Sequence, residues 1–338
     1  STPKPSSAAS DVYKRQLNVD INDISTPKIK DNQLLIKVMV AGVDPHIVLA
    51  LTGKVKLFGR YDFPKTLGNE LSGIVVEVGS QVNKFNAGDY VYTMPPLDDM
   101  GAFAEYIAVD ADYVAQMPEN LSFAQAAVPL SGLTIMQILQ MVKPKAGERL
   151  FISGGTGGFG QVAVPYAISK GLQVTVSGSK PSREIAEKLN AGFIDYMSTD
   201  YDQHEHIYDY VIDTRGVETV RKHLKLLKPG GRMISLNGGP NKRFAQRNQN
   251  FSYSRKILFS LIGFVLDNLA QLSKVQYDFL YVEANGEQLK QVTKFIEQTH
   301  FEPIIDSEYS FLQVNEAIKK ITTQQSQGKV LLNLENTY

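Results

Sequence analysis

Residues 149–160 read RLFISGGTGGFG, in which an apolar run ends in a turn rich in glycine. The residues that follow have the apolar period of a helix. Within the turn, Gly155, Gly157 and Gly160 have the G-x-G-x-x-G spacing, and Gly158 lies between the last two. A strand, this turn and a helix in succession are typical of a dinucleotide-binding βαβ unit, because glycine lets the backbone approach a pyrophosphate and the helix N-terminus attracts the anion. A glycine turn with only a structural role is the alternative.

Strand and helix patterns alternate along the chain after this turn. Runs that read as strands follow at 172–177, 192–197, 209–214 and 231–238, with helical patterns between them. Regular alternation of this kind indicates right-handed crossovers and a parallel sheet covered by helices. The run FLYV at 279–282 is a candidate sixth strand. The fold expected here is therefore α/β with a doubly wound parallel sheet.

The part of the chain before residue 134 has a different character. From 34 to 114, short apolar runs separated by Gly, Asp, Asn or Pro predict a mostly-β domain, and the period lengthens to a helix over 123–141. The closing stretch mixes helix and strand, so we expect it to return to the first domain. We therefore divide the chain into a mostly-β domain over 17–133, a dinucleotide-binding domain over 134–283 and a return segment over 284–338. Residues 1–16, rich in Ser, Pro and Ala, are interpreted as a non-native leader.

The composition excludes several classes of protein. The 338 residues include 35 Lys or Arg and 35 Asp or Glu, so no excess of positive charge exists to hold a nucleic acid. Cys is absent, which rules out disulfides and thiolate metal sites and fits a reducing, cytoplasmic location. The longest apolar run, 257–266, is shorter than the roughly 18 residues that suggest a membrane span, so no span is expected.

The residues about twenty positions after the glycine turn bear on the choice of cofactor. A carboxylate at this point binds the ribose 2′-hydroxyl of NAD, but the sequence has Ser177, Ser179, Lys180 and Arg183, with no acid before Glu184. Hydroxyl groups and cations suit a 2′-phosphate, which a carboxylate would repel. NADP(H) is therefore the predicted cofactor. Alternatively, the two cations merely start a solvated helix.

A long run in the first half carries a family resemblance. GNELSGIVVEVG at 68–79, followed by GDYV at 88–91, resembles the G-x-E-x-x-G-x-V-x-x-V-G and G-D-x-V motifs of the medium-chain dehydrogenase/reductase superfamily. Further matches are GAFAEY at 101–106, GLT at 132–134 and GKV at 328–330. The chain is most similar to the zinc-independent quinone oxidoreductases. The resemblance implies a GroES-like catalytic domain, discontinuous in sequence, together with a Rossmann domain that binds NADPH. It also implies a homodimer formed through the sixth strand of the Rossmann sheet.

Departures from the zinc alcohol dehydrogenases of this superfamily decide the expected chemistry. Where those enzymes have a Cys near the start and a His in a G-H-E triplet, this chain has VDP at 43–45 and GNE at 68–70. The one close pair of His, His204 and His206, lies in a polar stretch that we interpret as a loop, so no metal site is predicted. Without a Lewis acid, quinones and alkenes conjugated to a carbonyl are better hydride acceptors than simple alcohols.

In this scheme a hydrogen-bond donor stabilises the charge that develops on the carbonyl oxygen of the substrate. Tyr61 is the candidate donor, because it precedes Gly68 by the spacing of a substrate-side Tyr in the quinone reductase family and stays protonated at neutral pH. An aromatic that only lines the cleft fits the sequence equally well. Asp44 stands where many relatives have Asn. Since an ionised carboxylate would repel an enolate, we interpret Asp44 as a turn or positioning residue.

The resemblance also assigns residues to the cofactor. Thr134 matches a threonine near the nicotinamide, and Tyr196 matches a residue near the adenosine phosphate. Asn237 and Gly238 follow the fifth strand, where relatives pass along the nicotinamide side. Each of these residues could instead serve in packing.

The segment 252–273 is apolar on too many sides for an exposed helix. Burial against the sheet or a subunit partner is expected, and docking to a membrane surface is the weaker alternative. The three cations before it, Lys242, Arg243 and Arg247, are expected to be solvated.

Three functions stay open from the sequence. The first is an NADPH-dependent reductase of quinones or α,β-unsaturated carbonyls that uses no catalytic metal. The second is a reductase of alkenals or enoyl thioesters. The third is a protein that binds NADPH without catalysing a reaction.

Overall fold

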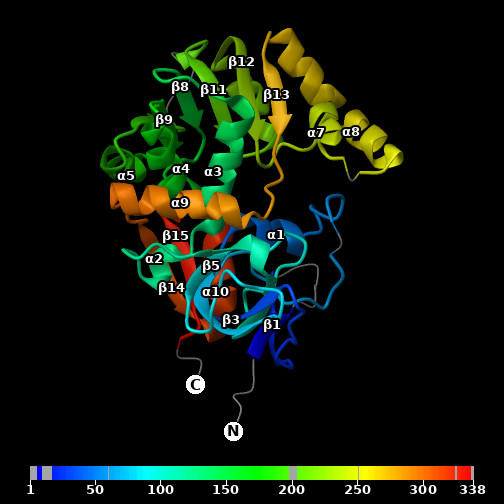
Figure 1. Cartoon of the computed structure of the whole chain (residues 1–338). Coiled ribbons are helices and arrows are strands. Elements are labelled where there is room, and N and C mark those ends of the chain that lie inside the picture. The colour runs from blue at the N-terminus through cyan, green and yellow to red at the C-terminus, as the bar shows by residue number, and fades with distance from the viewer. Residues whose placement is uncertain are drawn as a thin grey trace. The chain divides into compact units, whose positions relative to one another are not determined.

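The computed structural model describes residues 6–9, 17–59, 61–197, 204–249, 251–323 and 326–335. The chain forms two compact units. The first unit consists of residues 1–134 and 282–338, and the second of residues 135–281. In Figure 1 the blue and red ends of the chain therefore belong to one unit and the green to yellow middle to the other.

The second unit is built on a six-stranded parallel sheet with the order β10-β9-β8-β11-β12-β13. Its strands are β8 (Arg149–Ile152), β9 (Gln173–Gly178), β10 (Gly192–Asp195), β11 (Tyr208–Asp213), β12 (Leu227–Ser235) and β13 (Gln276–Phe279). This order is doubly wound, with the topological switch point between β8 and β11. The α/β fold that strand and helix alternation predicted is confirmed. The sixth strand, however, is β13 and not FLYV, of which only Phe279 belongs to the strand, although the N–H of Leu280 still donates to the carbonyl of Ser235.

A buried acid explains this shift. Asp278 lies in β13 with its side chain fully buried, and it pairs with Arg232 at 2.8 Å and with Arg247 at 2.6 Å. Because two cations neutralise it, the strand includes an acid that breaks the apolar run on which the sequence prediction rested. Arg247 stays exposed, as do Lys242 and Arg243, but its guanidinium also donates to the carbonyl of Phe279 at 2.9 Å, so it is more than a solvated cation.

Helices connect the parallel strands. They are α4 (Gly158–Ser169), α5 (Arg183–Lys188), α6 (Val217–Lys225), α7 (Lys242–Arg247) and α8 (Tyr253–Leu272), with the short 3-10 helix η2 (Lys180–Ser182). Helix α3 (Pro129–Val142) begins in the first unit and ends in the second. Helix α8 packs against α7 and β13 (Figure 1). It buries Phe259, Gly263, Leu266 and Ala270, so the expectation of burial holds for one side of this helix only.

The first unit contains a seven-stranded sheet with the order β14-β15-β3-β4-β5-β7, and β6 also pairs with β3. The strands are β3 (Gln33–Val43), β4 (Leu71–Val78), β5 (Tyr90–Thr93), β6 (Tyr106–Asp110), β7 (Val114–Gln116), β14 (Ile305–Ser310) and β15 (Lys329–Asn333). The return of the C-terminal segment completes this sheet, because β15 pairs antiparallel with β3. Strands β1 (Ser6–Ala9) and β2 (Asp20–Asp23) form a separate antiparallel ribbon. Strand β1 lies within the segment that was interpreted as a leader, and that interpretation stays a prediction.

The helices of the first unit are α1 (Pro45–Leu51), α2 (Phe123–Ala126), α9 (Gly286–Thr299) and α10 (Val314–Thr322), with the 3-10 helices η1 (Ala111–Tyr113) and η4 (Phe311–Gln313). Helix α1 lies in the mostly-β part of the chain, where the sequence pattern indicated no helix. The side chain of Asp44 accepts a hydrogen bond from the N–H of His46 and so caps this helix, and Pro45 occupies its first turn. The single helix expected over 123–141 is divided into α2 and α3 at Pro129, which cannot donate the backbone hydrogen bond that a continuous helix needs.

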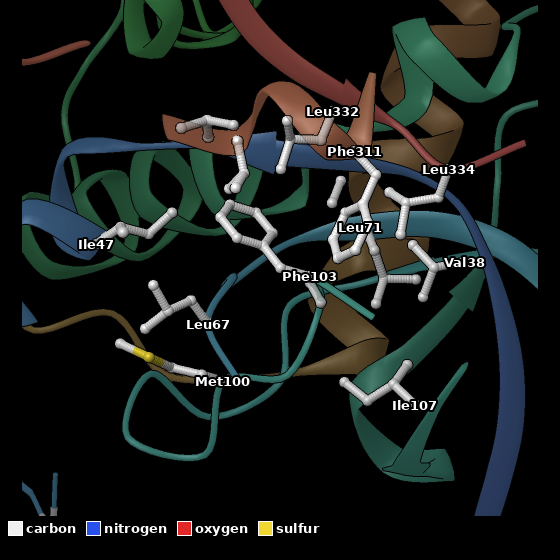
Figure 2. Close-up of a cluster of buried hydrophobic side chains, with 14 of the residues drawn as sticks. Val38, Ile47, Leu67, Leu71, Met100, Phe103, Ile107, Phe311, Leu332 and Leu334 are labelled. Carbon is white, nitrogen blue, oxygen red and sulfur yellow. The ribbon is translucent and has the colours of Figure 1, made fainter. Parts of the chain in front are cut away.

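The core of the first unit joins the two parts of the chain that build it. Phe103 and Leu71 come from the first part and Phe311 from the last, and all three are at least 99% buried. Figure 2 shows these side chains in one cluster with Leu332 and Leu334 of the return segment. The return segment is therefore part of the core of this unit.

One stretch of the described residues, 123–142, is long and apolar enough to cross a membrane. In the structure 72% of its most apolar window is buried inside the protein. Length and composition alone are weak evidence for a span, since core helices pass the same test.

Candidate cofactor and substrate sites

The glycine turn after β8 depends on the absence of side chains. A Cβ atom on Gly160 would lie 1.7 Å from the carbonyl oxygen of Gly155, and one on Gly155 would lie 2.5 Å from the side chain of Val176. Gly157 is the N-cap of α4 and offers no side-chain cap to the helix. The first turn of α4 is thus left open to an external anion, as a pyrophosphate site requires.

Hydroxyl groups hold the turn in place. The Oγ of Ser177 accepts a hydrogen bond from the N–H of Gly154 at 3.1 Å. Thr156 donates to the Oγ of Ser182 at 3.1 Å, and Ser182 donates to the carbonyl of Ser179 at 2.7 Å. Ser177 is buried, so its hydroxyl binds the backbone of the turn and is not presented to solvent.

The predicted cations lie beside this turn and are exposed. The guanidinium of Arg183 lies 4.7 Å from the ring centroid of Phe193, while Lys180 forms no salt bridge with any of the described residues. Tyr196 joins the same edge, since its N–H donates to the carbonyl of Gly178 at 3.1 Å. This region thus offers two exposed cations, Lys180 and Arg183, to an anionic ligand.

The loops after β8, β11 and β12 are linked at the switch point of the sheet. The N–H of Thr214 donates to the Oγ of Ser153 at 2.9 Å, and the Oγ1 of Thr214 donates to the carbonyl of Ser153 at 2.7 Å. The amide of Asn237 donates to the carbonyl of Thr214 at 2.7 Å. Parallel sheets bind ligands at the carboxyl ends of their strands where the winding reverses, so these linked loops form the candidate cofactor edge.

Asp213, at the end of β11, accepts hydrogen bonds from several groups around the candidate cofactor edge. Its fully buried carboxylate accepts hydrogen bonds from the Nδ1 of His223 at 2.9 Å and from the Oγ of Ser235 at 2.7 Å. It also accepts from the backbone of Arg215 and Gly216. Burial alone would raise the pKa of Asp213, but the hydrogen bond and charge of His223 and the hydrogen bond of Ser235 outweigh it and hold the pKa below its ordinary value.

Ser235 links Asp213 to the loop that follows β12. Its Oγ also accepts a hydrogen bond from the N–H of Gly238 at 2.7 Å, and a Cβ on Gly238 would lie 2.6 Å from that same oxygen. Sequence reasoning missed Asp213 and Ser235. An acid that ends a strand at the carboxyl edge of a parallel sheet was the signal that could have indicated Asp213.

In the first unit, Tyr61 lies in a polar pair with a residue that sequence reasoning missed. The hydroxyl of Tyr61, a buried side chain, donates to the carbonyl oxygen of Leu97 at 3.3 Å and lies 3.3 Å from the Nε2 of His46. Burial lowers the pKa of His46 to about 4, against the opposing influences of Asn69 and Asp98. His46 is therefore neutral at pH 7, and its ring can exchange a hydrogen bond with Tyr61 without adding charge.

Asp44 is placed by its own hydrogen bonds. One oxygen accepts from the N–H of His46 at 2.8 Å and the other accepts from the amide of Asn69 at 3.2 Å. Burial raises the pKa of Asp44, although Lys329 and Asn69 act in the opposite direction. Both oxygens are used in capping α1 and binding Asn69, so the geometry is that of a positioning residue.

Glu70, just before β4, forms a buried ion pair with Lys329 at the start of β15. Glu70 also accepts a hydrogen bond from the N–H of Leu130 at 2.9 Å, which fixes the first turn of α3. Thr134, one turn later, donates its hydroxyl to the carbonyl of Leu130 at 2.7 Å, so this hydroxyl is engaged within the helix. Burial raises the pKa of Glu70 despite the charge of Lys329.

The residues present do not fit a catalytic zinc. Among the described residues, no group of three His, Asp or Glu side chains could hold a metal ion. The two positions of lost ligands are taken by Asp44 and Asn69, which bind each other. His206 is bonded through Nδ1 to the carbonyl of Leu227, in line with its place in a loop.

Comparisons with known proteins agree with this fold. Residues 30–119 match the alcohol dehydrogenase GroES-like domain, and residues 191–332 match a family model described as zinc-binding dehydrogenase. The chain belongs to the medium-chain dehydrogenase/reductase superfamily. Both predictions from the sequence, the superfamily and the GroES-like first domain, are confirmed.

Individual relatives narrow the class. The chain is 29% identical to a 2-methylene-furan-3-one reductase of Solanum lycopersicum, covering 96% of this chain and 76% of the relative. It is 28% identical to an NADPH-dependent alkenal/one oxidoreductase, chloroplastic, of Arabidopsis thaliana, covering 95% of this chain and 78% of that protein. A solved quinone oxidoreductase from Coxiella burnetii superimposes with a TM-score of 0.81 at 26% identity, covering 98% of this chain and 100% of that one. The protein is accordingly an oxidoreductase of the quinone oxidoreductase-like group.

Proposed function

We propose that the protein is an NADPH-dependent reductase that transfers a hydride to quinones or α,β-unsaturated carbonyls without a catalytic metal. The observation that carries this proposal is the open glycine turn beside exposed Lys180 and Arg183, in a chain whose metal-ligand positions hold Asp44 and Asn69. The names of the relatives support the same class of reaction. Alkenals are included among the candidate substrates because one relative is named for them.

The second unit would hold the cofactor. When bound, NADPH supplies the hydride. The backbone of the turn at 154–160 and the N-terminus of α4 would bind its pyrophosphate, and Ser179, Lys180 and Arg183 its 2′-phosphate. Tyr196 would lie near the adenosine phosphate of NADPH. The loop of Asn237 and Gly238 would pass along its nicotinamide side.

Tyr61 would act on the substrate. As the conjugated carbon takes up hydride, negative charge moves to the carbonyl oxygen of the substrate. The single O–H of Tyr61, which donates to the carbonyl of Leu97 in the structure, would turn to donate to this oxygen instead. A neutral His46 beside the hydroxyl keeps it oriented without attracting its proton, as a carboxylate would. Asp44 positions His46 through the cap of α1 and does not itself transfer a proton.

A cofactor test addresses the first half of the proposal. We expect purified protein to bind NADPH at least tenfold more tightly than NADH by fluorescence titration. Lys180→Glu should abolish this preference, because a carboxylate repels the 2′-phosphate. Lys188→Glu, an exposed lysine at the end of α5, is the matched control and should retain it. No binding of either nucleotide would refute the proposed cofactor site.

A turnover test addresses the second half. NADPH oxidation is measured with a panel of quinones, enones and alkenals, beside elemental analysis for zinc. Tyr61→Phe should lower kcat by roughly 100- to 1,000-fold, the effect of losing one oxyanion donor, with NADPH affinity unchanged. Tyr113→Phe, in the same unit, serves as the control. Stoichiometric zinc would overturn the metal-free mechanism, and NADPH binding without turnover of any acceptor would favour a non-enzymatic role.

Two further statements remain proposals. A cytoplasmic location is proposed only because the composition, which lacks Cys, fits a reducing compartment. The names of two relatives instead give chloroplasts and mitochondria as their locations. A homodimer is the assembly that the family resemblance implies.

A further inference from the structure

A cavity of about 730 Å³ lies within the first unit. Its lining comes from strands β3, β5, β7, β14 and β15 and from helix α2, most of which are labelled in Figure 1. A volume of this size is typical of pockets that hold a small organic molecule. None of the lining residues belongs to the candidate cofactor edge or to the group around Tyr61. The proposed function therefore leaves this cavity without a role.

The inner side of the cavity is apolar. Val40, Met117 and Leu121 line it and are each at most 9% exposed. Tyr90 and Phe123 form an aromatic pair in the wall, with ring centroids 5.1 Å apart. Tyr90 is 53% exposed, so part of its ring is open to a ligand. The face of a tyrosine ring attracts a cation, and the buried side chains suit an apolar body.

The charged residues of the lining are all acidic. Asp89, Glu119, Glu308 and Glu335 line the cavity, and the lining includes no Lys, Arg or His. None of these four carboxylates forms a salt bridge within the described part of the chain. A concave surface with charges of one sign concentrates ligands of the opposite sign. The cavity is therefore complementary to a cation.

The carboxylates are spread around the cavity and are not gathered at one point. No three acidic or His side chains of the described residues lie close enough together to hold a metal ion. Gln116 donates a hydrogen bond to Asp89 at 3.1 Å, and Asn333 donates one to Glu308, so two of the carboxylates are held in place. One donor leaves other acceptor sites of a carboxylate unused. This arrangement suits an organic cation with an extended body better than a metal ion.

We propose that this cavity binds a small organic cation in which an ammonium group is attached to an apolar body. The apolar body packs against Val40, Met117 and Leu121, and the ammonium group lies near the ring of Tyr90 and the surrounding carboxylates. This binding site goes beyond the proposed function and depends on neither the cofactor nor the substrate of the reductase.

Binding is tested with benzyltrimethylammonium as the probe, by titration calorimetry on the full chain. We expect saturable binding that weakens as the salt concentration rises, because salt screens exposed charges. Benzyl alcohol keeps the aromatic body without the charge. It should bind at least about tenfold more weakly, because it gains neither the cation–π contact nor the attraction of the carboxylates. Benzenesulfonate, an anion, should not bind.

Single substitutions test the two parts of the site. Tyr90→Ala should lower the affinity for the probe about two- to fivefold, the effect of an exposed cation–π contact. Tyr253→Ala, at a tyrosine of the second unit that is 81% exposed, is the matched control and should leave the affinity unchanged. Glu119→Gln should weaken binding to a similar extent, and Glu184→Gln, at an exposed acid of α5, should not. Circular dichroism like that of the wild type shows that each variant folds.

The absence of Cys from the chain allows the bound probe to be located. Gln116→Cys places a single thiol in the lining of the cavity, and Gln173→Cys places one at an exposed position of β9 in the second unit. Saturating benzyltrimethylammonium should slow the reaction of an uncharged thiosulfonate reagent with Gln116→Cys. The reaction with Gln173→Cys should keep its rate.

Four results would overturn the proposal. The first is no saturable binding of the probe at low salt, which would make the acids an ordinary solvated surface. The second is equal affinity for benzyl alcohol, which would show that charge is not recognised. The third is binding that neither responds to Tyr90→Ala and Glu119→Gln nor protects Gln116→Cys, which would place the probe elsewhere. The fourth is tighter binding of trilysine than of the probe, which would assign the cavity to a basic peptide.

Discussion

The two units bury acidic side chains in opposite ways. In the second unit, Asp213 accepts hydrogen bonds from a His, a Ser and backbone N–H groups, and its pKa lies below the ordinary value. In the first unit, Asp44 and Glu70 share the influence of the single cation Lys329, and both pKa values lie above the ordinary value. Burial is similar in all three, so the number and quality of the donors decide the direction of the shift.

The opposite pKa shifts indicate different structural roles for Asp213 and for the pair of Asp44 and Glu70. Asp213 is a stable anion around which the loops of the candidate cofactor edge are hydrogen-bonded. Asp44 and Glu70 form a cluster in which one cation must serve two acids, so it is the more sensitive of the two regions to loss of a charge. The three changes below test this comparison in order of expected effect.

Removal of the cation should have the largest effect. Lys329→Met leaves Glu70 buried without its partner and should lower the free energy of unfolding by about 3–5 kcal/mol in urea denaturation. Lys320→Met, which removes a more exposed pair with Asp306, should cost less than about 1 kcal/mol. Equal losses in the two variants would contradict the proposed dependence of the first unit on Lys329.

Neutralising the well-satisfied acid should have an intermediate effect. Asp213→Asn replaces an acceptor by an NH₂ group that faces other donors, and it should lower the free energy of unfolding by about 2–3 kcal/mol. NADPH affinity should fall as well, because Ser235 would no longer hold Gly238. Asp209→Asn, at the opposite end of β11, is the control for stability and should leave NADPH affinity unchanged. Intact affinity in Asp213→Asn would show that this network does not shape the cofactor edge.

The smallest effect is on the pH dependence of stability. Asp44 has a raised pKa when folded, so between its ordinary and its raised value the folded state binds more protons than the unfolded state. Stability should therefore fall as pH rises through this window. Asp44→Asn keeps the cap of α1 and should flatten that fall, with a change below about 1 kcal/mol at low pH. Asp213, with its lowered pKa, contributes stability above the ordinary value that is lost as pH falls, so Asp213→Asn should not flatten the same window.

Most of the fold could be read from local patterns. Apolar runs and helical periods predicted the parallel sheet, and the glycine spacing located the turn that precedes α4. The errors lie where a local pattern depends on a distant partner. Asp278 broke an apolar run but is neutralised by Arg232 and Arg247, and the short helix α1, which begins at a cap formed by Asp44, was not predicted.

The candidate sites were less accessible to sequence reasoning. Gly155, Gly157 and Gly160 were found because their spacing is itself the signal. His46 was missed, although it lies two residues from Asp44, because its importance comes from the approach of Tyr61. Ser177 was assigned to the cofactor, but its hydroxyl supports the turn, which only the contact with Gly154 shows.

The sequence by itself determined the parallel sheet of the second unit, the glycine turn and the family, because each of these is indicated by short motifs of residues close together in the chain. The tertiary structure alone decided which buried charges meet, as in the pairs of Glu70 with Lys329 and of Asp213 with His223. It also decided which side of α8 remains exposed. The physical reason is that desolvation and ion pairing depend on neighbours in space, and folding brings those neighbours together from distant parts of the chain.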